Sequence, residues 1–359
     1  PPNSSVLLIR LRSIGDVILL TPALRLLKEW RPDLRITVVV ENRFRELLEN
    51  NPDIEELIDL GRGSGVAKIA GRVRVMREIR RRRFALCINL HGGPTGTLLT
   101  RGCGAKYKVG FDYYRSKGIY TVLIPDTKQI LGRRDVHTTE HQAAIFFHLG
   151  MPRSEIPRAQ LYLTPQQREW WNSKRASLGI SADREYAIVQ PTALYATKQW
   201  SAANFARLGE SLEREAGLLP VFSCGPNEEG LLDAAERAVG KKIVRLEGTR
   251  LGEFAAALEG ARIFIGNDSG PAHMAAALAR PVVVIFASSS SVIWGPWPRA
   301  TAGTSSRIVQ NHFDCNPCPG DRCYQFARPE CILSVTFEQV WTAVEEVLRS
   351  TALSYRKLS

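Results

Sequence analysis

The feature that most constrains the fold of this chain is an alternation of short apolar segments with helical stretches, which occurs twice. Apolar, β-rich segments such as VLLIRL, ITVVVE and FALCINL lie in the first half, and YAIVQPT, ARIFIGND and PVVVIFAS lie in the second. Helical stretches separate them, as at 19–30, 44–50 and 203–216. Apolar strands that alternate with helices indicate parallel sheets covered on both faces. We therefore predict an α/β protein whose ligands bind at the carboxyl ends of the strands.

The 359 residues are enough for two domains, each with its own core. A Pro-containing stretch, 151–167, indicates the linker. We predict an N-terminal α/β domain over 1–160 and a C-terminal one over 161–335. Residues 336–359 are expected to form a helix and tail that pack back toward the first domain.

The N-terminal apolar run is interrupted by Arg10 and Arg12, which indicates a strand and not a signal peptide. No apolar stretch reaches the roughly 18 residues that a membrane-spanning helix needs. These features predict a cytoplasmic protein.

The net charge of +12 is concentrated in one segment, because seven arginines and one glutamate lie between Arg72 and Arg83. Such a face could attract nucleic acid, anionic lipid headgroups or an acidic glycolipid. It could equally be a solvated helix face. No zinc-finger, homeodomain or RNA-recognition signature accompanies it, so we do not expect a nucleic-acid partner.

The segment 265–279, IGNDSGPAHMAAALA, combines a strand end with an Ala-rich helix. The backbone N–H groups of such a turn converge at a helix N-terminus, which suits a phosphate or diphosphate. Asp268 can accept hydroxyl hydrogen bonds and Ser269 can donate one. Gly270 permits close approach, and His273 lies on the first turn. An ordinary capped junction is the alternative.

Three further strand ends carry polar residues. After YAIVQ, Thr192 and Lys198 could bind phosphate oxygens, or Lys198 could be an exposed loop residue. In SCGPNEEG, Glu228 or its neighbour could bind ribose hydroxyls or complement the helix dipole. In RLRSIGDVILL, Asp16 begins a helix, where it could accept a proton or merely cap. P-loop and strand–GxGxxG–helix signatures are missing from the sequence, as is a D-x-D pair.

Together these motifs resemble the glycosyltransferases that move heptose from ADP-heptose during lipopolysaccharide core assembly. The segments RLRSIGDVILLTPAL, VGFDYYRSKG, PTALYATKQW and NDSGPAHMAAALARPVVVIFASSSSVIWGPW carry the resemblance. It implies the GT-B fold, in which two Rossmann-like domains face a central cleft. The first would bind the acceptor and the second the nucleotide sugar.

The resemblance also implies roles for the residues above. Asp16 takes the place of the general base, and Lys198 would stabilise the leaving diphosphate. The donor-binding positions would be Thr192, Lys198, Glu228, Asp268, Ser269, Gly270 and His273. The implied reaction is a direct, inverting displacement that needs no metal.

The implied acceptor is an anionic lipopolysaccharide precursor, ending in Kdo or heptose, bound by a monomer at the cytoplasmic face of the inner membrane. Two alternatives stay open. The first is transfer of heptose to protein hydroxyls, and the second is a GT-B-like protein that binds a nucleotide or anionic glycolipid without turnover.

Four cysteines, Cys315, Cys318, Cys323 and Cys331, fall within one segment. Prolines and a glycine in this segment favour turns. Four thiolates so spaced could bind a structural zinc ion or iron, since tetrahedral sulfur sites hold both. Reduced, unliganded cysteines are the alternative. In a cytosolic protein disulfides are less expected.

Overall fold

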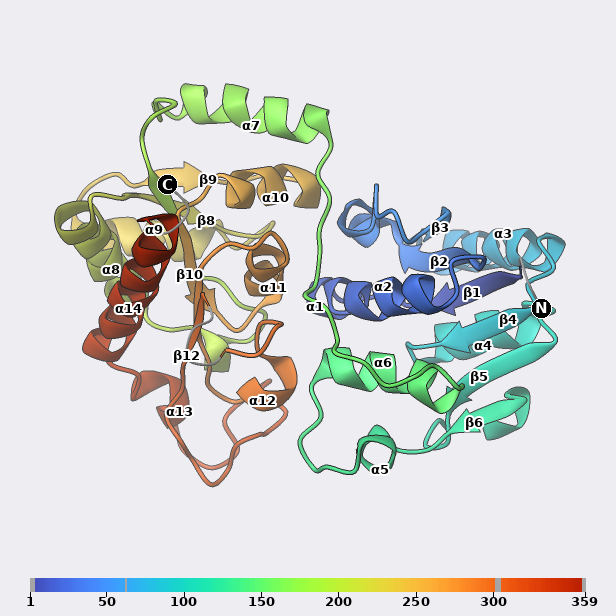
Figure 1. Ribbon diagram of the computed structural model, residues 1–359. Helices are drawn as coiled ribbons and strands as arrows, with labels where there is room; N and C mark the ends of the chain where they lie inside the picture. The colour runs from blue at the N-terminus through green and yellow to red at the C-terminus, as the bar shows by residue number, and fades with distance from the viewer. Residues whose placement is uncertain (1–3, 62, 301–304, 357–359) are drawn as a thin grey trace. The chain divides into compact units, whose positions relative to one another are not determined.

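The computed structural model describes residues 4–61, 63–300 and 305–356. The chain divides into two compact units, Pro1–Tyr162 and Leu163–Ser359. Residues 151–164, around this division, form neither helix nor strand. Each unit is an α/β layer structure with one sheet of parallel strands (Figure 1).

The first unit is built on a six-stranded sheet in the order β3-β2-β1-β4-β5-β6. All its neighbouring strands are parallel. The strands are β1 (Ser5–Ile9), β2 (Arg35–Glu41), β3 (Glu56–Leu60), β4 (Leu86–Asn89), β5 (Tyr107–Phe111) and β6 (Val122–Ile124).

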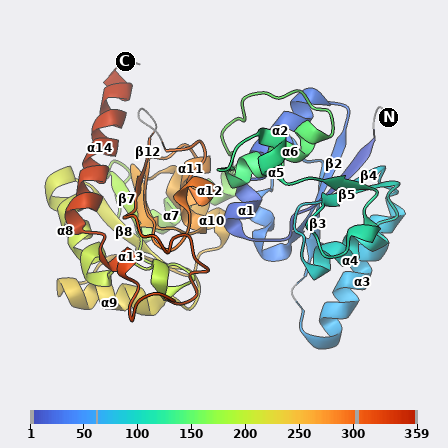
Figure 2. The ribbon, with the colours of Figure 1, turned by 90° about the horizontal axis from the view of Figure 1, so that it is seen from below.

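Helices cover both faces of this sheet, with α2, α5 and α6 on one side and α3 and α4 on the other (Figure 2). The helices are α1 (Ile14–Ile18), α2 (Thr21–Trp30), α3 (Gly65–Arg81), α4 (Pro94–Gly102), α5 (Thr127–Leu131) and α6 (Thr138–His148), with the 3₁₀ turns η1 (Asn42–Leu47) and η2 (Lys117–Ile119).

The second unit repeats the architecture, with a parallel sheet in the order β12-β11-β10-β7-β8-β9. When the strands of each unit are numbered from 1 to 6 along the chain, the first sheet has the order 3-2-1-4-5-6 of Rossmann-type folds. The second sheet has the same order when it is read from β9 to β12. The strands are β7 (Tyr186–Gln190), β8 (Leu219–Ser223), β9 (Val244–Leu246), β10 (Ile263–Asn267), β11 (Val282–Ile285) and β12 (Ser306–Val309).

The helices of this unit also lie on both faces of its sheet (Figure 1). They are α7 (Pro165–Ser177), α8 (Ala202–Ala216), α9 (Glu229–Val239), α10 (Leu251–Glu259), α11 (Gly270–Ala277), α12 (Ser291–Trp294), α13 (Glu330–Leu333) and α14 (Phe337–Arg356), with the 3₁₀ turn η3 (Ala196–Lys198). The sequence-based prediction of an α/β protein with two parallel sheets is therefore confirmed.

The central strands are apolar because both faces of each sheet are covered. Every residue of β7 and of β10 is buried. Gly266 in β10 is required by close packing, since a Cβ atom there would lie 2.9 Å from the carbonyl oxygen of Gln190. The two central strands therefore pair tightly where their polar ends emerge.

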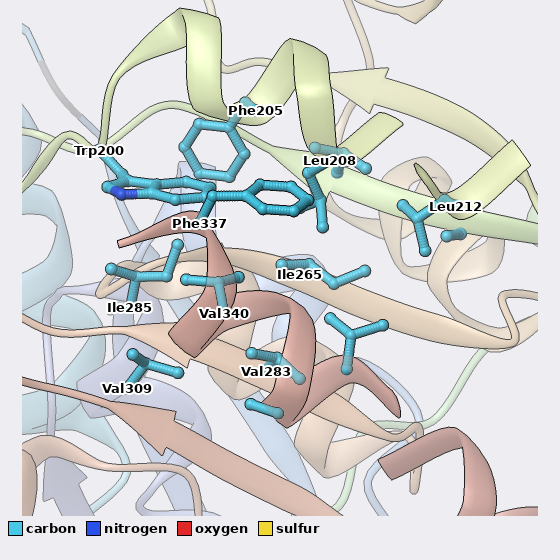
Figure 3. Close-up of a cluster of buried hydrophobic side chains, with 14 of the residues drawn as sticks. Trp200, Phe205, Leu208, Leu212, Ile265, Val283, Ile285, Val309, Phe337 and Val340 are labelled. Atoms are coloured by element: carbon cyan, nitrogen blue, oxygen red, sulfur yellow. The ribbon is translucent and has the colours of Figure 1, made fainter. Parts of the chain in front are cut away.

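The C-terminal helix α14 belongs to the core of the second unit. Its inward residues Phe337, Val340 and Val344 pack with Trp200, Phe205 and other buried side chains of this unit (Figure 3). The expected packing of the C-terminal segment toward the N-terminal domain stays a prediction. The apolar face of α14 packs against β11 and β12 of the second sheet.

Two strands were not predicted, β5 and β12. Both carry a charged residue, Lys108 in β5 and Arg307 in β12, which breaks the apolar pattern. The predicted helix at 44–50 is the 3₁₀ turn η1. Among the described residues, every helix is too short or too polar to cross a membrane.

Candidate functional site

The candidate site of the second unit lies where β7 and β10 end. These strands are neighbours at the centre of the sheet, and the chain leaves them toward opposite sides. This is the topological switch point, where open α/β sheets bind ligands. The sequence-predicted residues Thr192 and Lys198 follow β7, while Asp268, Ser269 and Gly270 follow β10.

The two strand ends are joined by an ion pair. Nζ of Lys198 lies 2.7 Å from Oδ2 of Asp268, and both side chains are largely buried. The hydroxyl of Ser289, just after β11, donates to the same oxygen. Asp268 therefore holds Lys198 at the strand edge, and its free hydrogen-bonding capacity is smaller than the sequence suggested.

A layer of buried amides supports this pair. The side chain of Asn267 is fully buried; its Nδ2 donates to the carbonyl of Pro191 at 2.8 Å, and its Oδ1 accepts from the Trp200 N–H at 3.0 Å. Gln190 donates to the hydroxyl of Thr192 at 2.5 Å. Thr192 is itself buried, so its hydrogen bond orients the loop after β7 from the protein interior. These bonds tie the loop after β7 to the turn after β10.

Helix α11 begins directly at this turn. Its cap residue Ser269 has extended backbone and makes no side-chain bond to the helix; its hydroxyl donates instead to the carbonyl of Asn267 at 3.1 Å. The first-turn N–H groups are thus left without a side-chain cap, as at helix N-termini that bind anions. Gly270 is half-buried beside them, and His273 is buried one turn into the helix.

Glu228 lies at the start of α9, after β8. Its Oε2 accepts from the Gly225 N–H at 2.8 Å, so the carboxylate stabilises the turn between β8 and α9. A Cβ atom on Gly225 would lie 2.7 Å from that oxygen, which explains the glycine. The neighbouring Glu229 is exposed. A ribose-binding role for Glu228 stays a prediction.

In the first unit, Asp16 lies at the corresponding switch point, after β1 and beside β4. Its Oδ1 is paired with the guanidinium of Arg10. Its Oδ2 accepts from the N–H and hydroxyl of Ser13, at 3.1 and 3.2 Å. Asp16 does cap α1, yet its side chain is 20% exposed, which leaves it within reach of a ligand hydroxyl.

Two histidines, His91 and His141, interact electrostatically with this carboxylate. Burial, followed by the charge of Arg10, lowers the pKa of His141 to about 4. Burial and the charges of Arg10 and Arg12 also lower the pKa of His91. His141 contacts the hydroxyls of Thr127 and Tyr113, at 2.8 and 3.3 Å. Both imidazoles are therefore neutral at pH 7, and Arg10 is a fixed cation next to Asp16.

The Cys-rich segment is docked on the carboxyl edge of the second sheet. The Cys318 N–H donates to the carbonyl of Ser288 at 2.9 Å, and the Thr197 hydroxyl donates to the carbonyl of Gly320. A Cβ atom on Gly320 would lie 3.6 Å from Cε of Lys198. The segment therefore forms a wall beside the Lys198 side chain.

All four cysteines line one cavity of about 200 Å³ in this wall. Within the described ranges, however, no three His, Cys, Asp or Glu side chains are grouped so that they could hold a metal ion. Cys331 lies in the core on α13, while the Cys323 sulfur accepts from the Phe326 N–H at 3.4 Å. The zinc or iron predicted from the spacing does not fit this arrangement.

Sequence reasoning missed two partners of the predicted residues, Arg10 and Ser289. Arg10 directly follows β1 and could have been recognised as a strand-end cation near Asp16. Ser289 lies in a serine run after β11, at the same sheet edge as Asp268. Its role depends on a contact between distant segments, which the run alone does not indicate.

The fold and both strand-end sites define a two-unit α/β protein of the glycosyltransferase class, and comparison with known proteins agrees. Residues 72–325 match the family model described as glycosyltransferase family 9 (heptosyltransferase). The chain therefore belongs to this family, and it is a glycosyltransferase. It is 30% identical to lipopolysaccharide heptosyltransferase 3 of Escherichia coli K12 over 295 residues, which are 80% of this chain and 83% of that protein.

Solved structures agree with the fold. The chain is similar to E. coli ADP-heptose lipopolysaccharide heptosyltransferase II, with a TM-score of 0.77, 18% identity and coverage of 97% of this chain and 99% of that one. It is also similar to E. coli heptosyltransferase WaaC with ADP, with a TM-score of 0.71, 19% identity and coverage of 96% and 99%. The GT-B fold implied by the sequence resemblance is thereby confirmed.

Proposed function

We propose that this protein transfers heptose from ADP-heptose to an anionic inner-core acceptor of lipopolysaccharide, ending in Kdo or heptose. Membership of the heptosyltransferase family carries the proposal. The two polar strand-end sites support it, because each sits at the switch point of its own sheet.

The second unit would bind the donor. The diphosphate would accept hydrogen bonds from the first N–H groups of α11, around Ser269 and Gly270. Lys198 would also donate to the phosphate oxygens. Its ammonium has three N–H donors, and the bond to Asp268 uses one of them. The carboxylate of Glu228 would contact the nucleotide. The buried Thr192 would orient the diphosphate-binding loop, and His273 would support the turn after β10.

The first unit would supply the base. The acceptor hydroxyl loses its proton to Asp16 as its oxygen forms a bond to the anomeric carbon. The bond from that carbon to the diphosphate oxygen breaks on the opposite face, which inverts the configuration. Negative charge grows on the leaving ADP, where Lys198 and the helix N-terminus stabilise it.

The positive charges replace a metal in this mechanism. Lys198 and the α11 N-terminus supply the electrostatic stabilisation that a divalent cation would otherwise give to a leaving diphosphate. The cysteine segment would act as a wall of the donor site and take no part in the chemistry.

Arg10 links acceptor binding to the availability of the base Asp16. Its guanidinium pairs with Asp16, and the acceptor of the proposed reaction carries carboxylates or phosphates. An incoming anionic group would compete for Arg10, which would release Asp16 to accept a proton. The acidic acceptor thus helps to expose the base. We place the protein, as a monomer, at the cytoplasmic face of the inner membrane, where such an acceptor would be made.

The test is an Asp16→Asn variant, compared with wild type for donor binding and for transfer. ADP-heptose affinity should stay within about twofold, while transfer falls by about 10²–10⁴-fold, the usual contribution of a general base. Persistent transfer within about tenfold of wild type would contradict the role of Asp16. Activity on protein hydroxyls with none on the glycolipid would favour the protein-acceptor alternative. Donor binding without any turnover in wild type would favour the non-catalytic binder.

A further inference from the structure

Helix α3 of the first unit has an inward face and an outward face of different character. Inward, Val75 and Ile79 are fully buried in the core of the unit, with Met76 packed against it. The helix lies beside α4 on one side of the sheet (Figure 2). Its packing therefore leaves the opposite side of the helix uncovered within this unit.

The outward face begins with exposed aliphatic side chains. Val66 is 83% exposed, Ile69 is 63% exposed and Val73 is 41% exposed. With Ala70 they follow the spacing of one helical stripe, and they line a shallow groove of about 410 Å³. Isolated exposed aliphatic residues are common, but a contiguous stripe on a helix that already has a buried face indicates a binding surface.

The same stripe continues into arginines. Arg74, Arg77 and Arg81 line the C-terminal half of the groove, and all three are exposed. In the part of the chain that the structure describes, these guanidinium groups make no hydrogen bond or ion pair. Arg82, by contrast, points to Glu56 and Glu78. The outward face is therefore apolar at one end and carries uncompensated positive charge at the other.

We propose that the outward face of α3 docks on an anionic lipid bilayer. Ile69, Val66 and Val73 would enter the boundary between headgroups and acyl chains, and the arginines would bind lipid phosphates. The helix has 17 residues, about 25 Å in length, so it can lie along the surface while its inward face stays in the core. A purely electrostatic partner such as nucleic acid would gain nothing from the aliphatic half of the groove.

This proposal deepens the membrane placement of the proposed function by naming the surface that docks, and in that respect it rests on it, whereas its test does not require heptose transfer. Vesicles of phosphatidylcholine mixed equally with phosphatidylglycerol contain neither donor nor acceptor, so their binding is independent of heptose transfer. In a flotation assay we expect wild type to bind these vesicles and not pure phosphatidylcholine.

Two variants separate the halves of the groove. The triple variant Arg74→Gln/Arg77→Gln/Arg81→Gln should bind about a hundredfold more weakly, since each arginine near an anionic surface contributes about fivefold to the affinity. The double variant Ile69→Ser/Val73→Ser keeps the net charge and should still lose about tenfold. Unchanged thermal melting would show that both are folded, and Val66→Ser alone replaces the double variant if it melts early.

The matched control removes three charges from the second unit, as Arg237→Gln/Lys241→Gln/Lys242→Gln. These residues are exposed and lie far from α3 in sequence. The control should bind vesicles within about threefold of wild type, allowing for the long-range loss of charge. Equal weakening in the control and the α3 triple variant would overturn the proposal. So would wild-type binding by Ile69→Ser/Val73→Ser, or binding to duplex DNA that only the arginine variant loses.

Discussion

The ammonium of Lys198 lies 2.7 Å from Oδ2 of Asp268, and this ion pair joins the ends of two central strands of the second sheet. Ser289 donates to the same carboxylate oxygen from a third strand end. Asp268 therefore positions the cation at the N-terminus of α11, where the proposed diphosphate would lie. The pair makes Lys198 a fixed part of the site and not a mobile surface lysine.

Replacement of Lys198 tests this relationship. Lys198→Ala should reduce transfer by about 10²–10³-fold, because a charge that stabilises the leaving group is lost. Lys198→Arg should recover part of the rate. If Lys198 and Asp268 act as a unit, the double variant Lys198→Ala/Asp268→Ala loses little more than Lys198→Ala alone in steady-state kinetics. Additive losses would show that Asp268 acts independently.

Asn267 should be important for stability as well as binding. Asn267→Ala leaves the Pro191 carbonyl and the Trp200 N–H buried without this partner. We expect a loss of about 2–3 kcal/mol in the free energy of unfolding, measured by urea denaturation. Asn172→Ala, at an exposed position on α7, is the control and should change stability by less than about 0.5 kcal/mol. A neutral Asn267→Ala would contradict the role of this amide layer.

The lowered pKa of His141 predicts a pH effect on the first unit. Burial and Arg10 lower this pKa to about 4 from the ordinary 6.5, so the unfolded chain binds the proton more readily than the folded one. The stabilisation from the neutral imidazole is therefore complete above pH 6.5 and is lost as the pH falls toward 4.

His141→Gln should remove this part of the pH dependence. The stability difference between wild type and His141→Gln should shift by about 2–3 kcal/mol against wild type between pH 7 and pH 4. Urea denaturation across this range measures it. A difference that stays constant with pH would show that His141 titrates normally in the folded protein.

Removal of divalent metal should leave transfer intact. We expect wild type treated with a strong chelator to transfer heptose at a rate within about twofold of untreated protein, because Lys198 and the α11 N-terminus carry the positive charge. Metal analysis of the same sample tests the cysteine segment separately. Loss of activity that zinc or iron restores would contradict both the metal-free mechanism and the role of the segment as a simple wall.

The sequence predicted the general fold well because the strands are apolar on both faces and alternate with helices. It failed for β5 and β12, where Lys108 and Arg307 interrupt the pattern. It predicted α14 as a helix, but not the core residues that its apolar face contacts. An amphipathic helix shows that one face is buried, but the sequence does not say which sheet it covers. That choice depends on Trp200 and other residues more than a hundred positions away.

The sequence predicted that the candidate site residues lie at strand ends, but it did not predict which of them contact each other. Lys198 and Asp268 were both expected at strand ends, since each follows an apolar segment. Their ion pair could not be predicted, because it depends on β7 and β10 being neighbours. The cysteine spacing likewise showed only that the thiols are close in sequence. In the fold all four line one cavity, but Cys331 is buried on α13 while the other three are half-buried.

The most direct test of the central claim is a transfer assay with ADP-heptose and a heptose-deficient lipopolysaccharide precursor, read by mass spectrometry of the glycolipid. UDP-glucose is the control donor in the same assay. The account predicts that the acceptor gains the mass of one heptose residue with ADP-heptose only, and that ADP is released in equal amount. Transfer from UDP-glucose instead, or no product although ADP-heptose binds, would contradict it.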